Sequence, residues 1–185
     1  MTDTKEKLVA AGERLFARDG VHRVKVKDLN ELAGQRNASA LHYHFGSRDG
    51  LLRAIVDKHQ QVVDANRAER LTALGPDPEL RELVEVVLAP LAERLRSPSG
   101  RDYLRIVPQL LDLDGVAPAA LDQAMKLLGD RLAELSRELR AERQRAMLLA
   151  AFTLLADRAG RKKPALAPDV FLANLVDMAT GMLRG

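Results

Sequence analysis

The stretch VKDLNELAGQRNASALHYHFGSRDGLL, residues 26–52, decides the fold that we expect for this chain. It contains two short runs with helical spacing, separated by a turn at Gly34, and then the start of a longer helix. Gly46 is suited to end the second helix and Ser47 to cap the third. A small helix exposed on a helical scaffold is the usual means of reaching base edges in the DNA major groove, so the stretch predicts a helix-turn-helix head.

The second helix of this stretch, expected over residues 37–45, has two different faces. At about 100° per residue, its apolar face points to a core that also takes side chains from the two preceding helices: Ala38, Leu41 and Phe45, with Phe16, Leu29 and Leu32. The opposite face, with two histidines on its flanks, is short and polar: Arg36, Ser39, Ala40 and Tyr43, with His42 and His44. Arg pairs with guanine, Ser donates or accepts, and an Ala methyl meets a thymine methyl. This face therefore predicts a base-reading surface, although the same residues also suit the plain surface of a helical hairpin.

Charge is distributed unevenly along the chain. Residues 1–60 hold 11 Lys and Arg against 8 Asp and Glu, whereas residues 61–185 hold 18 against 18. The net charge of +3 thus falls on the expected head, where phosphates would dock, although so small an excess also fits a solvated surface. Tyr and His at the edges of the reading helix can reach phosphate oxygens, as can Lys25, Lys27 and Arg48.

Composition excludes several classes of protein. The chain is 46% hydrophobic and 30% charged with few aromatics, which favours an all-α soluble protein. It has no Cys, and His42 and His44 diverge on a helix, so we expect no metal site and no cofactor. The longest apolar run, residues 147–156, is about half of the roughly 20 residues that a membrane span needs, and no signal peptide is evident. We therefore expect a cytoplasmic protein without a membrane partner.

The pattern predicts an all-α fold of about nine helices, with an N-terminal three-helix helix-turn-helix head and a C-terminal helical regulatory and dimerisation body. We place the two domains at residues 1–50 and 51–185, with a clear break in the chain at residues 75–78. The expected helices cover residues 3–19, 26–33, 37–45, 48–74, a segment ending near 96, 101–111, 118–140, 141–159 and 168–183.

The motifs DLNELAG (residues 28–34) and ALHYHFGSRDGLL (residues 40–52) resemble the N-terminal domain of the TetR family of bacterial transcription regulators. The resemblance covers about residues 5–56, and the turn GQRN is one residue longer than is common in that family. It implies DNA contacts from the second and third helices and the start of the fourth: Lys25, Lys27, Gln35, Arg36, Asn37, Ser39, Ala40, His42, Tyr43, His44 and Arg48.

Specific DNA sites usually require two heads about one helical turn, roughly 34–36 Å, apart, so we expect a homodimer. The resemblance implies that the last two helices form a four-helix bundle across a two-fold axis, and both are unusually apolar. The expected interface residues are Met147, Leu148, Ala151, Leu155, Leu172, Leu175, Met178, Ala179 and Met182. The alternative is that one apolar face is simply core.

The helices of the body are also expected to enclose a pocket for a small apolar effector. The candidate ligand-binding residues are Tyr103, Ile106, Val107, Leu110, Met125 and Phe152. A filled core fits these residues equally well.

The function that we expect is that of a sequence-specific transcriptional regulator, a dimeric repressor released from operator DNA by a small molecule. An enzyme is not expected, because the chain has no Gly-rich phosphate loop, no Ser or Cys nucleophile motif and no HExxH pattern. The alternative is a helical adaptor protein whose head makes protein contacts.

Overall fold

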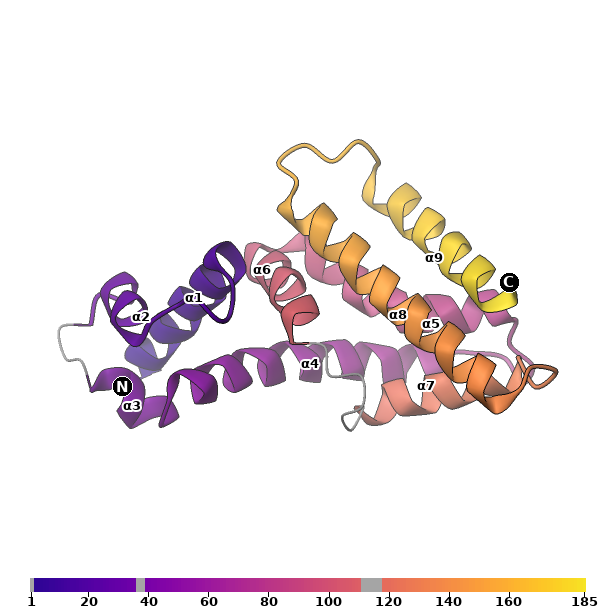
Figure 1. Cartoon of the computed structure of the whole chain (residues 1–185), viewed down its shortest axis with the longest axis horizontal. Coiled ribbons are helices and arrows are strands. Elements are labelled where there is room, and N and C mark those ends of the chain that lie inside the picture. Colours follow the sequence, from indigo (N-terminus) through magenta and orange to yellow (C-terminus); the bar gives the residue numbers. More distant parts are fainter. Residues whose placement is uncertain (1, 36–38, 111–117) are drawn as a thin grey trace.

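The computed structural model describes residues 2–35, 39–110 and 118–185, and over these residues the chain is helical with no strand (Figure 1). The all-α fold expected from the sequence is confirmed. In chain order the elements are α1 (Thr2–Asp19), α2 (Val26–Leu32), α3 (Ala40–Phe45), α4 (Arg48–Thr72), α5 (Leu80–Glu93), the 3₁₀ turn η1 (Arg94–Arg96), α6 (Pro98–Ile106), the 3₁₀ turn η2 (Val107–Gln109), α7 (Ala119–Asp130), α8 (Arg137–Gly160) and α9 (Pro168–Arg184).

The head is built from α1, α2, α3 and the first half of α4 around one hydrophobic cluster. Helix α1 supplies the buried residues that its spacing predicts: Leu8, Ala11, Leu15 and Phe16. Leu29 of α2, Leu41 of α3 and Ile55 of α4 complete the cluster. Ile106, at the end of α6, is also fully buried in it, so the body inserts a side chain into the core of the head.

Helix α4 connects head and body as one continuous rod along the length of the molecule (Figure 1). Leu51, Leu52 and Ile55 near its start lie in the head cluster, whereas Val63 lies in the body cluster. The apolar contacts of the head thus extend beyond residue 50, where we expected the domain boundary. That boundary stays a prediction. Helix α4 therefore contributes side chains to both hydrophobic cores.

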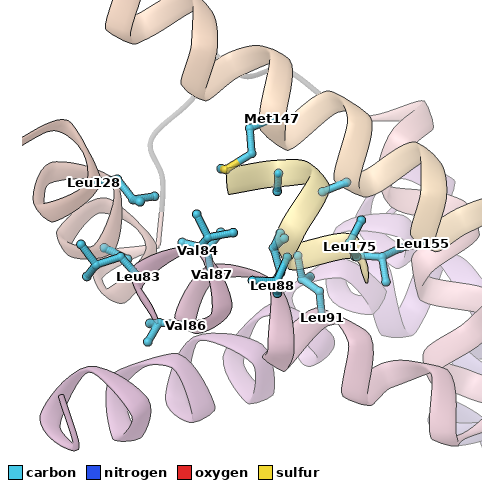
Figure 2. Close-up of a cluster of buried hydrophobic side chains, with 14 of the residues drawn as sticks. Leu83, Val84, Val86, Val87, Leu88, Leu91, Leu128, Met147, Leu155 and Leu175 are labelled. Atoms are coloured by element: carbon cyan, nitrogen blue, oxygen red, sulfur yellow. The ribbon is translucent and has the colours of Figure 1, made fainter. Parts of the chain in front are cut away.

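The body packs α5 between α4, α7, α8 and α9 (Figure 1). Figure 2 shows Val84 and Leu88 of α5 among Leu128, Met147 and Leu175 from the surrounding helices. Pro90 lies inside α5, which changes to the 3₁₀ turn η1 after Glu93. Among the helices described, none is both long and apolar enough for a membrane crossing.

Four expected helix boundaries were wrong, at both ends of α6, at the end of α7 and at the start of α8, and Ser side chains explain the two starts. The helix expected over residues 118–140 ends at Asp130. Helix α8 begins at Arg137, because the Ser136 Oγ caps it by accepting the Leu139 N–H at 3.2 Å. Residues 97–100 were expected to form a loop, but Ser97 caps α6 by accepting the Gly100 N–H at 3.0 Å. Helix α6 then ends at Ile106 rather than at residue 111, one residue before the turn that contains Pro108.

Candidate nucleic-acid interface

Helix α3 is a short helix held against the head by its apolar side. Leu41 is buried beneath it, and Phe45 packs partly buried against the head cluster. The Lys5 ammonium of α1 lies 6.0 Å from the centroid of the Phe45 ring. These contacts fix the orientation of a helix that is too short to be stable alone.

The opposite side of α3 faces solvent. Tyr43 is 73% exposed, and Ser39 and His42 are also exposed. The His44 ring is half-buried and meets the Tyr43 ring edge to face, with 5.0 Å between the centroids. The ring contact limits the rotamers of Tyr43 and so presents an oriented hydroxyl on the outer surface.

Two expectations about the faces of these helices need correction. Ala40 was placed on the outer face, but it is half-buried and packs against the head cluster. Leu32 was placed in the core, but it is 47% exposed at the edge of a shallow hollow between α1 and α2. Arg36, Asn37 and Ala38 lie outside the described residues.

In the turn from α3 to α4, Gly46 and Ser47 have the roles that the sequence predicts. Gly46 ends α3 with a φ of +71°, a left-handed conformation that favours glycine. Ser47 caps α4 as expected, since its Oγ accepts the Gly50 N–H at 2.9 Å. A methyl group at Gly50 would collide with the Phe45 carbonyl oxygen, so glycine is needed at this position too.

The cations expected to contact phosphate differ in the contacts that they make within the protein. Lys25 is exposed, and its backbone N–H donates to the Asp28 carboxylate at 3.1 Å, which is the return bond of a capping box at the start of α2. Lys27 forms an exposed ion pair with Glu31 at 3.8 Å, a weak contact that phosphate can displace.

Arg48 and Gln35 make contacts within the protein. The Arg48 guanidinium donates to the Val21 carbonyl, pairs with Asp49 at 2.6 Å and lies 5.6 Å from the centroid of the Phe16 ring. The amide of Gln35 donates to the Ala33 carbonyl at 3.1 Å. A role for either residue at DNA stays a prediction.

The expected dimer interface stays a prediction, and its nine residues differ in how far a single chain buries them. Five of the nine residues are buried within a single chain, in the body cluster: Met147, Ala151, Leu155, Leu175 and Ala179. Leu148 and Leu172 are half-buried against the same cluster, whereas Met178 and Met182 are exposed. Buried side chains cannot contact a second copy, because they already fill the space between α5, α8 and α9.

The residues expected to line an effector pocket mostly pack against the two hydrophobic clusters, and the pocket itself stays a prediction. Tyr103 and Val107 are buried in the body cluster, and Ile106 is buried in the head cluster. Leu110 packs on the head, Phe152 is half-buried on the body, and Met125 borders a separate surface hollow. The six residues therefore do not line one common cavity.

A buried polar network at the joint of head and body was missed by the sequence analysis. Glu13 of α1 is 4% exposed, and its Oε1 lies 2.9 Å from both the Lys58 Nζ and the His59 Nε2 of α4. The His59 ring stacks on Tyr103 of α6 at 4.5 Å between centroids. We call these residues and the two that also contact His59 the junction cluster: Glu13, Lys58, His59, Arg94, Ser99 and Tyr103.

The partners of His59 fix its tautomer. The Arg94 guanidinium, which only donates, lies 3.3 Å from the His59 Nδ1, so Nδ1 accepts and Nε2 carries a proton toward Glu13. Burial would raise the pKa of Glu13, but hydrogen bonds from His59, Lys58 and Ser99 outweigh it and lower the pKa to about 2. Burial raises the pKa of Tyr103 to about 12. Glu13 is thus an ionised acceptor that joins α1 to α4.

A signal for this network was present in the sequence but was ambiguous. Glu13 falls among the buried positions of α1, close to Ala11 and Leu15, where a charged side chain needs a buried partner. His59 occupies a similar position on α4. Neither position indicates its partner, because the two residues are 46 positions apart and meet only in the fold.

Comparison with known proteins places the head in a family. Residues 8–55 match the model of a family described as bacterial regulatory proteins, tetR family. A probable HTH-type transcriptional regulator, ArpR of Pseudomonas putida, is 31% identical over 84 residues, which span 44% of this chain and 40% of ArpR.

Solved structures repeat the fold over nearly the whole chain. A TetR-like transcriptional regulator from Rhodococcus sp. RHA1 is similar with a TM-score of 0.69 and 16% identity, covering 98% of this chain and 96% of that one. The fatty acid degradation regulator FadR from Bacillus halodurans is similar with a TM-score of 0.64 and 13% identity, with the same coverage. At these identities the likeness shows the fold alone. The head, residues 8–55, therefore matches the tetR family of bacterial regulatory proteins, and the whole chain shares its fold with solved regulators described as TetR-like.

Proposed function

We propose that the protein is a sequence-specific DNA-binding transcriptional regulator of the cytoplasm that acts as a homodimeric repressor and leaves its operator when a small molecule binds the body. The observation that carries the proposal is α3 itself. Leu41 anchors this helix from below while Ser39, His42 and Tyr43 face solvent, on the segment that matches the family. Such a rigid polar helix fits the major groove, where base edges are read.

The dimer surface that we propose is the outward side of α8 and α9, which carries the two exposed residues of the expected interface, Met178 and Met182. The two helices lie next to each other at the outside of the body (Figure 1). Their exposed large apolar side chains are Leu139, Leu149, Leu154, Val170, Met178 and Met182. Exposed Gly181 adds a position where a partner helix can approach closely.

The route from body to head runs through α6 and α4. Helix α6 packs on α1, inserts Ile106 into the head core and carries two members of the junction cluster, Ser99 and Tyr103. An effector that binds more tightly when α6 has one placement in the body than when it has another changes the orientation of the head. It regulates only if the preferred body conformation sets the two heads at a spacing that the operator does not fit.

The experiment is a titration of the purified protein with the DNA upstream of its own gene at increasing salt. We expect tight binding at low salt and a steep linear fall of log K with log salt, because Lys and Arg displace counterions from phosphates. A helical adaptor would show no such binding, and neither the family match nor the fold favours that alternative. Members of this family act by binding rather than by catalysis, so we expect no enzymatic activity.

A further inference from the structure

A hollow on the described surface of the body lies between η1, α6, the end of α8 and the segment leading to α9, and has a volume of about 780 Å³. This size is within the range of small-molecule sites, roughly 300–1,000 Å³. Its charged lining is mainly basic, with two acidic residues: Arg96, Arg101, Arg158, Arg161 and Lys162, against Glu93 and Asp169.

Over the part of the chain that the structure describes, ion pairs within the protein neutralise only one of the five cations that line the hollow. Arg161 is neutralised by Asp157 at 2.6 Å, and Glu93 is held by Arg70 at 2.6 Å. Throughout the residues described, no carboxylate lies within 4.0 Å of the other four cations of the hollow, Arg96, Arg101, Arg158 and Lys162. Four cations that share a concave surface repel one another, and that repulsion is relieved when an anion binds between them.

Two of these cations are held in place by the fold. Arg158 is only 9% exposed, its guanidinium lies 4.3 Å from the centroid of the Phe171 ring, and its Nη2 donates to the Leu166 carbonyl at 2.8 Å. Arg101 donates from Nη1 to the Leu95 carbonyl at 3.0 Å. Each contact uses one edge or face of a planar guanidinium and leaves other N–H groups for a ligand.

The remainder of the lining has no polar side chain: Ala92, Leu95, Ala159, Gly160, Pro164 and Pro168. We propose that this hollow binds a small organic anion, a molecule with a carboxylate or phosphate group on an apolar body. The fixed guanidiniums of Arg101 and Arg158 hold the anionic group, and the aliphatic lining receives the apolar part. This proposal rests on the proposed function and names the chemical class of its effector, which the sequence predicted to be simply apolar.

The position of the hollow suggests how its occupation reaches the head. Arg101 on α6 lines the hollow, while Ser99 and Tyr103 on the same helix contact His59 in the junction cluster. An anion that draws Arg101 toward Arg158 pulls on α6, and α6 packs directly on α1 of the head. Ligand binding and head orientation are then linked through one short helix.

Calorimetric titration of the full chain in phosphate-free buffer tests the proposal with four probes that share one ring system. The probes are 2-naphthoate, 2-naphthyl phosphate, neutral 2-naphthol and 2-naphthylmethylammonium. We expect both anions to bind at least tenfold more tightly than the neutral and cationic probes. The tighter of the two anions shows whether the site favours a carboxylate or a phosphate group.

A matched pair of variants locates the binding. Arg101→Gln/Lys162→Gln removes two cations of the hollow, whereas Arg137→Gln/Lys163→Gln removes two exposed cations that do not line it. We expect the first variant to bind both anions at least tenfold more weakly and the second to bind them like the unmodified chain. Circular dichroism on both variants verifies that the helices are retained.

Three results would overturn the proposal: equal affinity for 2-naphthol and the anions, no measurable anion binding, or an unchanged affinity in the Arg101→Gln/Lys162→Gln variant. If that variant loses affinity for random-sequence duplex DNA while still binding naphthoate, the cations belong to a DNA-contacting surface instead. None of these results affects binding of operator DNA by the ligand-free protein, so this inference and the proposed function fail separately.

Discussion

Gly50 lies in the first turn of α4, after the Ser47 cap. A Cβ atom at this position would collide with the Phe45 carbonyl oxygen. We expect Gly50→Ala to force the turn between α3 and α4 open and to lower the free energy of unfolding by about 1–3 kcal/mol, the usual range for overpacking. Thermal unfolding followed by circular dichroism measures the loss. Gly75→Ala, where a methyl group meets open space, is the control and is expected to leave the melting temperature nearly unchanged.

Glu13 makes stability depend on acid pH. Its pKa of about 2 in the folded chain lies below the ordinary value of 4.5, so its stabilising contribution is complete above pH 4.5 and is lost as the pH falls toward 2. This contribution is on the order of 3 kcal/mol. We expect Glu13→Gln to unfold at lower denaturant concentration than the unmodified chain at pH 7, with the difference shrinking below pH 4.5.

Exposed Glu6 on the same helix is the control for this prediction. Glu6→Gln is expected to follow the unmodified chain at every pH. Equal stability of Glu13→Gln and the unmodified chain at pH 7 would contradict a role for the carboxylate in joining α1 to α4.

At the residue scale, the sequence predicted local contacts and missed distant ones. The cap at Ser47 and the burial of Leu41 follow from spacing within a few positions. Arg48 was expected at phosphate, but its guanidinium lies between Phe16 and the Val21 carbonyl, two groups brought to it only by folding. The same reason explains why the pairing of Glu13 with His59 was not predicted.

At the element scale, periodicity shows that a helix has an apolar face but not what covers that face. Helices α8 and α9 were correctly recognised as apolar, yet Met147 and Leu175 pack inside the chain and Met178 faces solvent. Whether an apolar face packs inside the chain or faces a second copy depends on where α5 lies, and the sequence of α8 and α9 does not show this. Ser136 interrupts a region of continuous helix-forming residues, so the start of α8 was placed too late.

The outward side of α8 and α9 makes a prediction about assembly. We expect Met178→Glu to shift the protein from dimer to monomer in sedimentation velocity, because a carboxylate buried between two copies lacks a partner. Val62→Glu places the same charge on exposed α4 and is expected to leave the dimer intact. A monomer for the unmodified chain, or a dimer that tolerates Met178→Glu, would count against this surface.

At the scale of the whole molecule, the regulator is a head carried on α4 and held from the side by α6 (Figure 1). Sequence patterns predicted the all-α architecture and the head because both arise from local periodicity and turn residues. Three of the residues that they assigned to an effector pocket, Tyr103, Ile106 and Val107, are buried in the core, because a hollow depends on how helices are arranged. The cations of the observed hollow come from η1 and α6, and from the end of α8 and the residues after it, two parts of the chain that are far apart in sequence.

The coupling of the body to the head is tested through Tyr103. We expect Tyr103→Phe to retain the ring stacking on His59 and operator binding, whereas Tyr103→Leu removes the stacked ring and weakens the hold of α6 on α4. In the Leu variant, hydrogen exchange of α1 amides should quicken at least severalfold relative to the Phe variant. Equal protection in the two variants would show that the head does not depend on this contact.

The central claim is that the exposed side of α3 reads DNA, and the affinity of Tyr43→Ala for labelled upstream duplex, measured by fluorescence anisotropy, tests it most directly. We expect specific binding to fall at least tenfold, because each good base contact contributes about 1–3 kcal/mol, while the dimer and its melting temperature stay unchanged. Val62→Ala, an exposed apolar position away from α3, is the control and should bind like the unmodified chain. Unchanged operator affinity in Tyr43→Ala would contradict the assignment of α3 as the reading helix.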